Sequence, residues 1–378
     1  MTLRPRIRKA VTLFHLWFGL GLGLYFAVIG LTGSFLVFRS DVEERAMPEL
    51  VRVAALPGAK FVPVSALVAS VKKRFPGADD ATLRSLTWPR YPGGAYELTV
   101  DGKSVTVSPY TGDVLREIDL SRNPIEIIRS LHTELLWPAK GMLLNTYGGL
   151  LLTLLLLSGL WIWWPKTFRQ LRARVTIKWR VSLKRTMLDL HNVFGSLGLA
   201  VLLMFCITGA VFGVWQTAHD NLYRLLGQIK PLPVPTSVVV PPGGRALPYD
   251  VLVADVESDM PGAHLEALTY PTKADTPITA YGALDDGHSA YISLALDPYT
   301  GRLLQREDAR EVPTAGITMR WIHFMHLGQW GGWTVKIVYS LFGLLPTGLF
   351  VTGGGRWFLR KRGQRAVTAS PSVAPNER

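Results

Sequence analysis

Residues 13–38 read LFHLWFGLGLGLYFAVIGLTGSFLVF, a run of 26 residues that contains no Asp, Glu, Lys or Arg. A helix needs about 20 mostly apolar residues to cross the roughly 30 Å hydrocarbon layer of a bilayer. Three more apolar runs reach this length, at 142–164, 187–215 and 333–359. The sequence therefore predicts an integral membrane protein, mainly α-helical, with four transmembrane helices.

The composition agrees with this class and excludes several kinds of site. The 378 residues are 48% hydrophobic and 18% charged, with a net charge of +13 and a single cysteine, Cys206. One cysteine excludes an internal disulfide, a cysteine-rich zinc or iron–sulfur centre and the C-x-x-C-H signal for covalent haem attachment. Any bound cofactor must therefore be held by other ligands.

The basic residues are concentrated in three segments, 1–12, 165–186 and 356–378. These segments hold 18 Lys and Arg and one acidic residue, Glu377, so they carry net +17 and the rest of the chain net −4. Short loops rich in Lys and Arg stay on the cytoplasmic side. The charge is thus a topology signal and not a sign of nucleic-acid binding. Both termini are predicted to be cytoplasmic, and residues 39–123 and 216–316 lie on the opposite side. The first apolar run is too long for a cleavable signal peptide and is expected to remain as an anchor.

Recurring motifs show that the chain is a tandem duplication. The pattern His15-x3-Gly19 with Thr32-Gly33 recurs 176 residues later as His191-x3-Gly195 with Thr208-Gly209. A second set recurs 194 residues later: His132, Gly149, Gly159 and Trp163 correspond to His326, Gly343, Gly353 and Trp357. The sequence Pro-Tyr-Thr-Gly at 109–112 recurs at 298–301. Because both halves start from the cytoplasm, we expect two parallel halves related by a pseudo-twofold axis along the membrane normal.

Each half is expected to contain helix, small α+β domain, approach helix and helix. The predicted segments are an N-terminal cytoplasmic segment 1–12, spans 13–38 and 187–215, soluble domains 39–123 and 216–316, approach helices with spans 124–164 and 317–359, a basic loop 165–186 and a cytoplasmic tail 360–378. In the first soluble domain, a helix over 64–74 precedes strands at 82–88, 95–100, 104–107 and 113–118, and the second domain repeats this order over 249–307.

Four histidines carry the functional signal, because ionisable residues in or near membrane spans are costly and therefore functional candidates. His15 and His191 lie at the cytoplasmic ends of the first and third spans, and His132 and His326 precede the second and fourth spans. The duplication therefore predicts one symmetric pair near each membrane face. Two neutral imidazoles on facing helices are suited to axial ligation of haem iron.

Glycines are expected to clear space for a porphyrin beside these ligands. Gly19 and Gly195 follow His15 and His191 by one helical turn and so share their face. Gly328, Gly331 and Gly332 are expected to serve His326, whereas His132 has no such glycine nearby in sequence. The alternative for such glycines is ordinary helix packing.

Other histidines remain open. His323 is an alternative outer ligand, a propionate partner or an interfacial polar residue. His219 has either a structural role or a position on the side where substrate binds. His264 and His288 are expected on the surface.

The chain resembles the PepSY-associated transmembrane family. The resemblance rests on the paired Pro-Tyr-Thr-Gly segments, Leu131-His132, the segment SGLWIWW at 158–164, the span start His191-x3-Gly195 and Met325-His326-x-Gly328, and it covers about residues 8–362. Within the family the likeness is to the di-haem inner-membrane reductases of ferric siderophores, of the ferrioxamine reductase type. This resemblance implies a bacterial inner-membrane location, periplasmic PepSY-like domains, two b-type haems and reduction of an Fe(III)–siderophore to release Fe(II).

The expected ligand sets are His15 with His191 for the inner haem and His132 with His326 for the outer haem. The expected partners are the lipid bilayer, the siderophore complex and a separate electron donor. Trp88, Tyr91, Tyr110 and Tyr299 are candidate chelate contacts. The alternatives are a PepSY-type binding or regulatory module without redox activity, a metal transporter, and haem-based transfer to another acceptor such as a quinone or copper.

Overall fold

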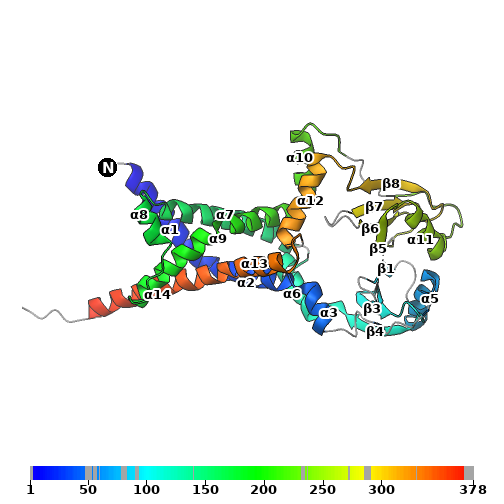
Figure 1. The fold of residues 1–378 in the computed structure, drawn as a ribbon, viewed down its shortest axis with the longest axis horizontal. Helices are drawn as coiled ribbons and strands as arrows, with labels where there is room; N and C mark the ends of the chain where they lie inside the picture. The colour runs from blue at the N-terminus through cyan, green and yellow to red at the C-terminus, as the bar shows by residue number, and fades with distance from the viewer. Residues whose placement is uncertain are drawn as a thin grey trace, which may run out of the picture. The chain divides into compact units, whose positions relative to one another are not determined.

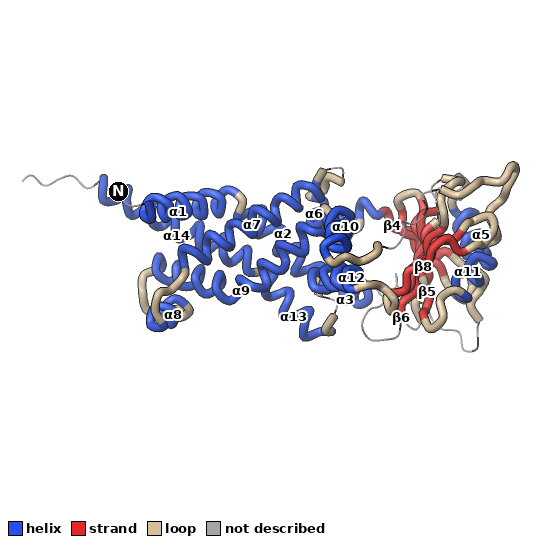
Figure 2. Tube along the Cα trace, turned by 90° about the horizontal axis from the view of Figure 1, so that it is seen from above, coloured by secondary structure: helices blue, strands red, loops and turns tan. Residues whose placement is uncertain are grey.

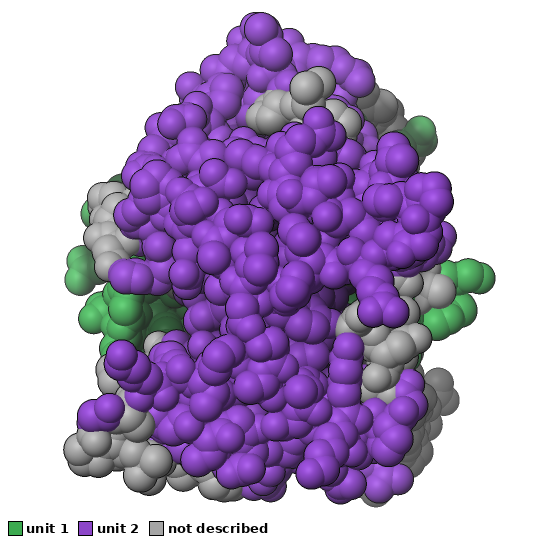
Figure 3. All heavy atoms as spheres, turned by 90° about the vertical axis from the view of Figure 1, so that its right-hand side faces the viewer, with its two compact units in different colours: residues 1–37, 128–215, 322–378 green, residues 38–127, 216–321 purple. Residues whose placement is uncertain are grey.

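The computed structural model describes residues 3–46, 53, 58, 60–77, 83–89, 93–138, 140–230, 235, 237–270, 273–284, 291–328 and 330–369. The chain divides into two compact units (Figure 3). The helical unit comprises Met1–Val37, Ile128–Trp215 and Ile322–Arg378, and the sheet unit comprises Phe38–Ile127 and Gln216–Trp321. Tyr91 and His288 lie outside the described residues.

The helical unit is built from long apolar helices (Figure 1). Their bounds are α1 Leu3–Gly21, α2 Gly23–Leu36, α7 Gly141–Trp163, α9 Leu183–Gly213, α13 Gly332–Gly343 and α14 Leu345–Ala369, with a short α8 at Phe168–Arg174. Two further helices, α6 Pro124–Glu134 and α12 Thr314–Leu327, end in this unit. Within the described residues, three helices are long and apolar enough to cross a membrane, at Gly141–Trp163, Leu183–Gly213 and Gly332–Gln364.

The first predicted span is not one straight helix. α1 and α2 meet at Leu22 with a bend of 58°, and they add a fourth candidate span only if they are counted together. Glycines on both sides of Leu22 weaken the helix at this point. Gly23 also packs against the ring of Phe350, where a Cβ atom would collide with it. Close packing against α14 therefore accompanies the bend.

The fourth predicted span is interrupted more mildly. α13 ends at Gly343 and α14 starts at Leu345, one residue before Pro346. Proline has no N–H to donate to the preceding turn, which accounts for the interruption. The span is thus divided into two helix segments just before this proline.

The sheet unit contains eight strands that form one antiparallel sheet (Figure 2). The strands are β1 Leu83–Thr87, β2 Tyr96–Val100, β3 Lys103–Val107, β4 Val114–Asp119, β5 Ala263–Thr269, β6 Ile278–Leu284, β7 Tyr291–Leu296 and β8 Leu303–Asp308. Their order is β4-β3-β2-β1-β5-β6-β7-β8. The helices of the unit are α3 Arg39–Ala46, α5 Val64–Arg74, α10 Trp215–Leu225 and α11 Tyr249–Ser258, with a short 3₁₀ turn at Leu120–Arg122.

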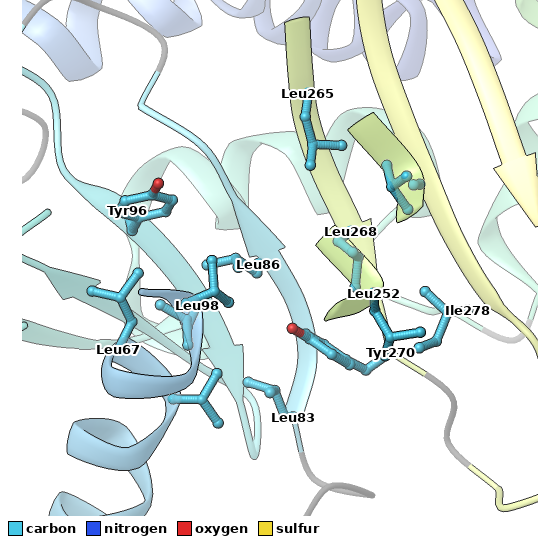
Figure 4. Close-up of a cluster of buried hydrophobic side chains, with 14 of the residues drawn as sticks. Leu67, Leu83, Leu86, Tyr96, Leu98, Leu252, Leu265, Leu268, Tyr270 and Ile278 are labelled. Atoms are coloured by element: carbon cyan, nitrogen blue, oxygen red, sulfur yellow. The ribbon is translucent and has the colours of Figure 1, made fainter. Parts of the chain in front are cut away.

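The two predicted soluble domains share one sheet and one hydrophobic core. β1 pairs with β5 through Leu86↔Leu268, so the two repeats join at their first strands. α5 and α11 contribute Leu67 and Leu252 to a common cluster with the strands (Figure 4). Burying a leucine side chain contributes about 2 kcal/mol. The predicted strands are present to within one residue or two, but their fusion was not anticipated.

The repeated Pro-Tyr-Thr-Gly segments form tight turns, as their chemistry predicts. Gly112 and Gly301 have φ values of +75° and +70°, which favour glycine. The Gly112 amide donates to the Ser108 carbonyl at 3.0 Å, and the Gly301 amide donates to the Asp297 carbonyl at 2.9 Å. Each turn connects the third and fourth strands of its repeat.

Asp308 at the end of β8 forms a buried ion cluster that yields a stability prediction. Its carboxylate lies 2.6 Å from an Arg306 nitrogen and accepts a 2.8 Å hydrogen bond from Arg310 Nε. The Arg310 contacts hold the pKa of Asp308 below its usual range. The stabilisation is therefore present above pH of about 4 and is lost as pH falls through the lowered pKa.

We expect Asp308→Asn to reduce the free energy of unfolding by about 2 kcal/mol at pH 7, because two guanidinium groups lose their carboxylate. Thermal denaturation of the full chain in detergent between pH 3 and 8 measures this. The difference from the unmodified protein should shrink below pH of about 4. The matched control is Asp119→Asn, at the exposed equivalent in the first repeat, which should have a smaller effect. Equal losses for both variants would contradict the prediction.

Candidate functional site

The four candidate histidines form two pairs, both within the helical unit. His15 of α1 and His191 of α9 have ring centres 6.2 Å apart and nearly perpendicular planes, at 86°. His132 of α6 and His326 of α12 have ring centres 6.4 Å apart, with planes at 44°. Each pair joins one residue from each repeat.

The Nδ1 atom of each inner histidine contacts the helix that follows it in the same repeat. His15 Nδ1 lies 3.2 Å from the Leu155 carbonyl oxygen and 3.0 Å from Ser158 Oγ, both on α7. His191 Nδ1 lies 3.2 Å from both the Leu349 carbonyl oxygen and Thr352 Oγ1 on α14. The two repeats therefore hold their histidines in the same way.

The outer histidines repeat this arrangement against the helices that precede them. His132 Nδ1 lies 3.0 Å from the Ile29 carbonyl oxygen and 3.1 Å from Thr32 Oγ1, on α2. His326 Nδ1 lies 2.9 Å from Thr208 Oγ1 on α9. All four imidazoles thus have Nδ1 beside a hydroxyl of the same repeat.

These contacts determine the tautomer of each ring. A carbonyl oxygen only accepts hydrogen bonds, so Nδ1 must carry the proton where it contacts one. The hydroxyl groups already donate to their own helices, as Thr208 does to the Met204 carbonyl at 2.6 Å and Ser158 to that of Leu155 at 2.7 Å. They are therefore available to accept from Nδ1–H. In every ring Nε2 is left unprotonated, with a lone pair available for a metal.

A glycine follows each of these hydroxyl residues and makes room for the imidazole. An added Cβ atom would lie 2.8 to 3.2 Å from the Cε1 atom of the adjacent histidine. The glycine–histidine contacts are Gly159 with His15, Gly353 with His191, Gly33 with His132, and Gly209 with His326. The recurrence of Thr32-Gly33 as Thr208-Gly209 was visible in the sequence. It was interpreted only as evidence for the duplication, and the contact of these residues with the histidines was not predicted.

The ring spacing fits two imidazoles that bind one metal from opposite sides. A metal–imidazole nitrogen bond is about 2 Å long and the ring centre lies about 1 Å behind the nitrogen, so the ring centres would be about 6 Å apart. Within the described residues, no group of three or more His, Cys, Asp or Glu is placed to hold a metal ion. Each pair therefore brings together two candidate ligands.

Gly19 and Gly195 lie one helical turn after the inner histidines, and a methyl group at either position would make ordinary van der Waals contact with a leucine. The nearest side-chain atom to an added Cβ would belong to Leu155 at 3.9 Å for Gly19 and to Leu349 at 3.7 Å for Gly195. All four paired histidines keep part of their surface exposed. The role of Gly19 and Gly195 beside a flat cofactor therefore stays a prediction.

The expected glycine cluster after His326 has another role. Gly328 packs against Tyr339 and Gly331 against Val335. The glycine that lies against His326 is Gly209, from a distant part of the chain. Likewise His132, which has no glycine nearby in sequence, lies against Gly33. Sequence proximity was misleading because the clearance comes from the neighbouring helix.

The remaining predicted residues do not join either ring pair, although His323 shares the Phe212 ring with His326. His323 packs edge-on against Phe212, with ring centres 5.5 Å apart, and belongs to neither pair. His219 lies in the sheet unit, 4.7 Å from the ring of Tyr223. Tyr110 packs against Phe61, and the Tyr299 hydroxyl donates to the Ala274 carbonyl at 2.8 Å. Trp88 packs against the core of the sheet unit.

α9 fixes the distance between the pairs along the bundle. His191 and Thr208, which contacts His326, are 17 residues apart on this uninterrupted helix. A rise of 1.5 Å per residue separates them by about 25 Å along the axis. Asp189, the buried acid near the start of α9, is paired with Arg185 at 2.9 Å. The two pairs therefore lie near opposite ends of the longest helix.

The glycine contacts can be tested by adding a methyl group. We expect Gly159→Ala to lower the thermal denaturation midpoint, because its Cβ would lie 2.9 Å from His15 Cε1 and overpacking costs about 1–3 kcal/mol. Gly363→Ala on α14 is the matched control, since no other atom lies within 4 Å of that added Cβ. The assignment of a steric role to Gly159 would be wrong if both variants were equally stable.

The comparisons with known proteins agree with the fold. The family described as PepSY-associated TM region matches residues 12–360. Among curated proteins, none matches this chain. The match covers both repeats and all four paired histidines. The chain is therefore a membrane protein that belongs to the PepSY-associated TM region family.

Proposed function

We propose that this chain is a transmembrane electron-transfer protein that carries two b-type haems and reduces an Fe(III)–siderophore outside the cytoplasm. His15 and His191 would hold one haem, and His132 and His326 the other. The observation that carries the proposal is the spacing of the two ring pairs, 6.2 and 6.4 Å, with Nε2 free in each ring.

The chain's own residues supply binding and orientation. Haem provides a one-electron Fe(III)/Fe(II) couple when bound. The Nδ1 contacts of the four histidines fix the direction of each Nε2 lone pair and increase the basicity of the ring. Gly19 and Gly195 place no side chain on the helix face one turn after the inner histidines. A nucleophile or a general acid–base pair is not needed for this reaction.

The proposed topology places the two sites at opposite faces of the bacterial inner membrane. We infer four crossings in two parallel halves, with both termini and the basic loop in the cytoplasm and the sheet unit in the periplasm. This orientation rests on the distribution of Lys and Arg. The separation of about 25 Å along α9 is close to the hydrocarbon thickness of about 30 Å. A separate protein would supply electrons at the cytoplasmic face.

The proposed acceptor follows from the family resemblance and from coordination chemistry. Siderophores bind iron(III) through hard oxygen ligands, and one electron converts it to iron(II), which these ligands hold less tightly. The reaction consumes one electron for each iron and releases Fe(II) from the chelate. The sheet unit, on the same side of the membrane, is the part of the chain available to bind the complex.

Absorption spectra of the detergent-purified protein test the proposal. The reduced protein should show the bands of low-spin bis-histidine haem, with two haems per chain by pyridine haemochrome assay. His15→Ala with His191→Ala should remove one haem, and His132→Ala with His326→Ala the other. His264→Ala is the control and should retain both. A colourless protein would refute the proposal, and a coloured one that ferric siderophore does not reoxidise would refute the acceptor.

The hydroxyl beside His326 should influence the electron affinity of the outer site. Thr208→Val keeps the side-chain shape but removes an acceptor of the Nδ1–H bond. Because this bond makes the ring a stronger donor, its loss should raise the midpoint potential of one haem. Thr208→Ser should retain the original potential, since Ser158 has the same role beside His15. Redox titration followed by absorbance measures this, and equal potentials for Thr208→Val and the unmodified protein would contradict it.

A further inference from the structure

One face of the sheet carries polar and aromatic groups that the fold does not require. In β6, Ala280 and Gly282 face the core, so Tyr281 between them points to the opposite face. Tyr281 pairs with Ser293 of β7, and Ser293 pairs with Glu307 of β8. Paired residues lie on the same face of a sheet, so these three form a row across three strands. Tyr291, two residues before Ser293, lies on this face as well.

The polar groups of this row are available to a ligand. Tyr281 is 44% exposed and Tyr291 is 36% exposed. Within the described part of the chain, neither phenol oxygen makes a hydrogen bond, and the Glu307 carboxylate has no hydrogen bond or ion pair. Burial and the nearby Glu307 carboxylate raise the pKa of Tyr291 and of Tyr223, in that order of importance. The strand pairings independently place Glu307 and Tyr281 on the same face, two strands apart.

Two helices add groups at the border of this face. Tyr223 of α10 is almost fully buried, at 2% exposure, and lies beside His219 and Gly316. Arg320 of α12 donates a 3.3 Å hydrogen bond to the carbonyl of Ala309, the residue whose amide donates to the Tyr291 carbonyl. The face thus combines phenol rings and a carboxylate with a guanidinium at its border.

The first repeat has the same backbone but not the same chemistry. β3 corresponds to β7 with an offset of 189 residues, which follows from the shared turn motif. The strand pairings Leu98↔Val105 and Ala280↔Leu294 extend this correspondence to β2 and β6. The equivalents of Tyr281, Tyr291 and Glu307 are therefore Thr99, Gly102 and Ile118. A repeat that folds without phenols or a carboxylate at these positions shows that they are not needed for folding.

We propose that the face formed by Tyr281, Tyr291 and Glu307, bordered by Tyr223, His219 and Arg320, is the binding site for the ferric chelate. The inference rests on the proposed function and adds the location of its substrate. Phenol rings cover the apolar arms of a chelator, and their hydroxyl groups bond its amides. Glu307 accepts from amide N–H or ammonium groups, and Arg320 pairs with the electron-rich oxygens around iron(III).

Binding of a redox-inert chelate to the full-length protein tests this site separately from electron transfer. The probe is the Ga(III) complex of a trihydroxamate siderophore, titrated by calorimetry in detergent. We expect Tyr281→Ala and Glu307→Gln each to weaken the Kd at least tenfold. The matched control, Thr99→Ala in the first repeat, should remain within twofold of the unmodified protein. Haem content and the thermal denaturation midpoint should be unchanged in all three variants.

The outcomes separate this site from the proposed function. The site is overturned if the unmodified protein does not bind the gallium chelate, or if Tyr281→Ala and Glu307→Gln bind it as tightly as the unmodified protein. In those cases, retained reoxidation of the reduced protein by the ferric chelate would still support the proposed function. Loss of binding in the two variants but not in Thr99→Ala supports the site, whatever the haem measurements show.

Discussion

The contact between each paired histidine and a neighbouring helix is the constraint on which the site depends. An uncharged imidazole in an apolar bundle carries a free-energy cost unless its polar atoms are hydrogen-bonded. A hydrogen bond from Nδ1–H to a carbonyl or hydroxyl oxygen offsets this cost. The same hydrogen bond leaves Nε2 as the ring nitrogen with a free lone pair. Each of these contacts lies within one repeat, whereas each ring pair joins the two repeats. Each repeat carries this local motif twice, and duplication of the repeat therefore produces two histidine pairs.

The two repeats are joined differently in the two units. In the sheet unit they merge through the β1–β5 pairing into one core. In the helical unit they differ where they pack: the first repeat bends between α1 and α2, and the second is interrupted between α13 and α14. α2 packs against both α13 and α14, and Gly30 of α2 lies against the carbonyl of Gly343. Glycines of α2 therefore let it approach both helices closely, with Gly23 against Phe350 of α14 and Gly30 against Gly343 of α13.

The sequence predicted the apolar helices, the strands and the histidine pairs because each depends on a local pattern or on the duplication. It did not predict the bend at Leu22, which depends on packing against Phe350 as well as on flanking glycines. It placed the clearance for His326 at Gly328, whereas Gly209 provides it. Spacing along a helix identifies residues on the same face, but it does not identify the residue that a neighbouring helix presents. The sequence also did not predict that the two repeats share one sheet. Each repeat alone has a complete set of strands, and local patterns do not identify a pairing with the other repeat.

If the two histidine pairs hold haems as proposed, different surroundings would give the two sites different electron affinities, although the histidines are held alike. The surroundings of the rings supply such a difference. His326 lies 5.2 Å from the ring of Phe212 and 6.2 Å from that of Phe205, measured between ring centres. The residues 176 positions earlier, which belong to the helix beside His132, are Leu36 and Ile29. The outer rings are also tilted at 44°, whereas the inner rings are nearly perpendicular. Packing and polarity around a ligand tune the potential of the metal that it binds. The duplicated motif thus accounts for the likeness of the two sites, and the aromatic residues around the outer pair give a physical reason for a difference in their potentials.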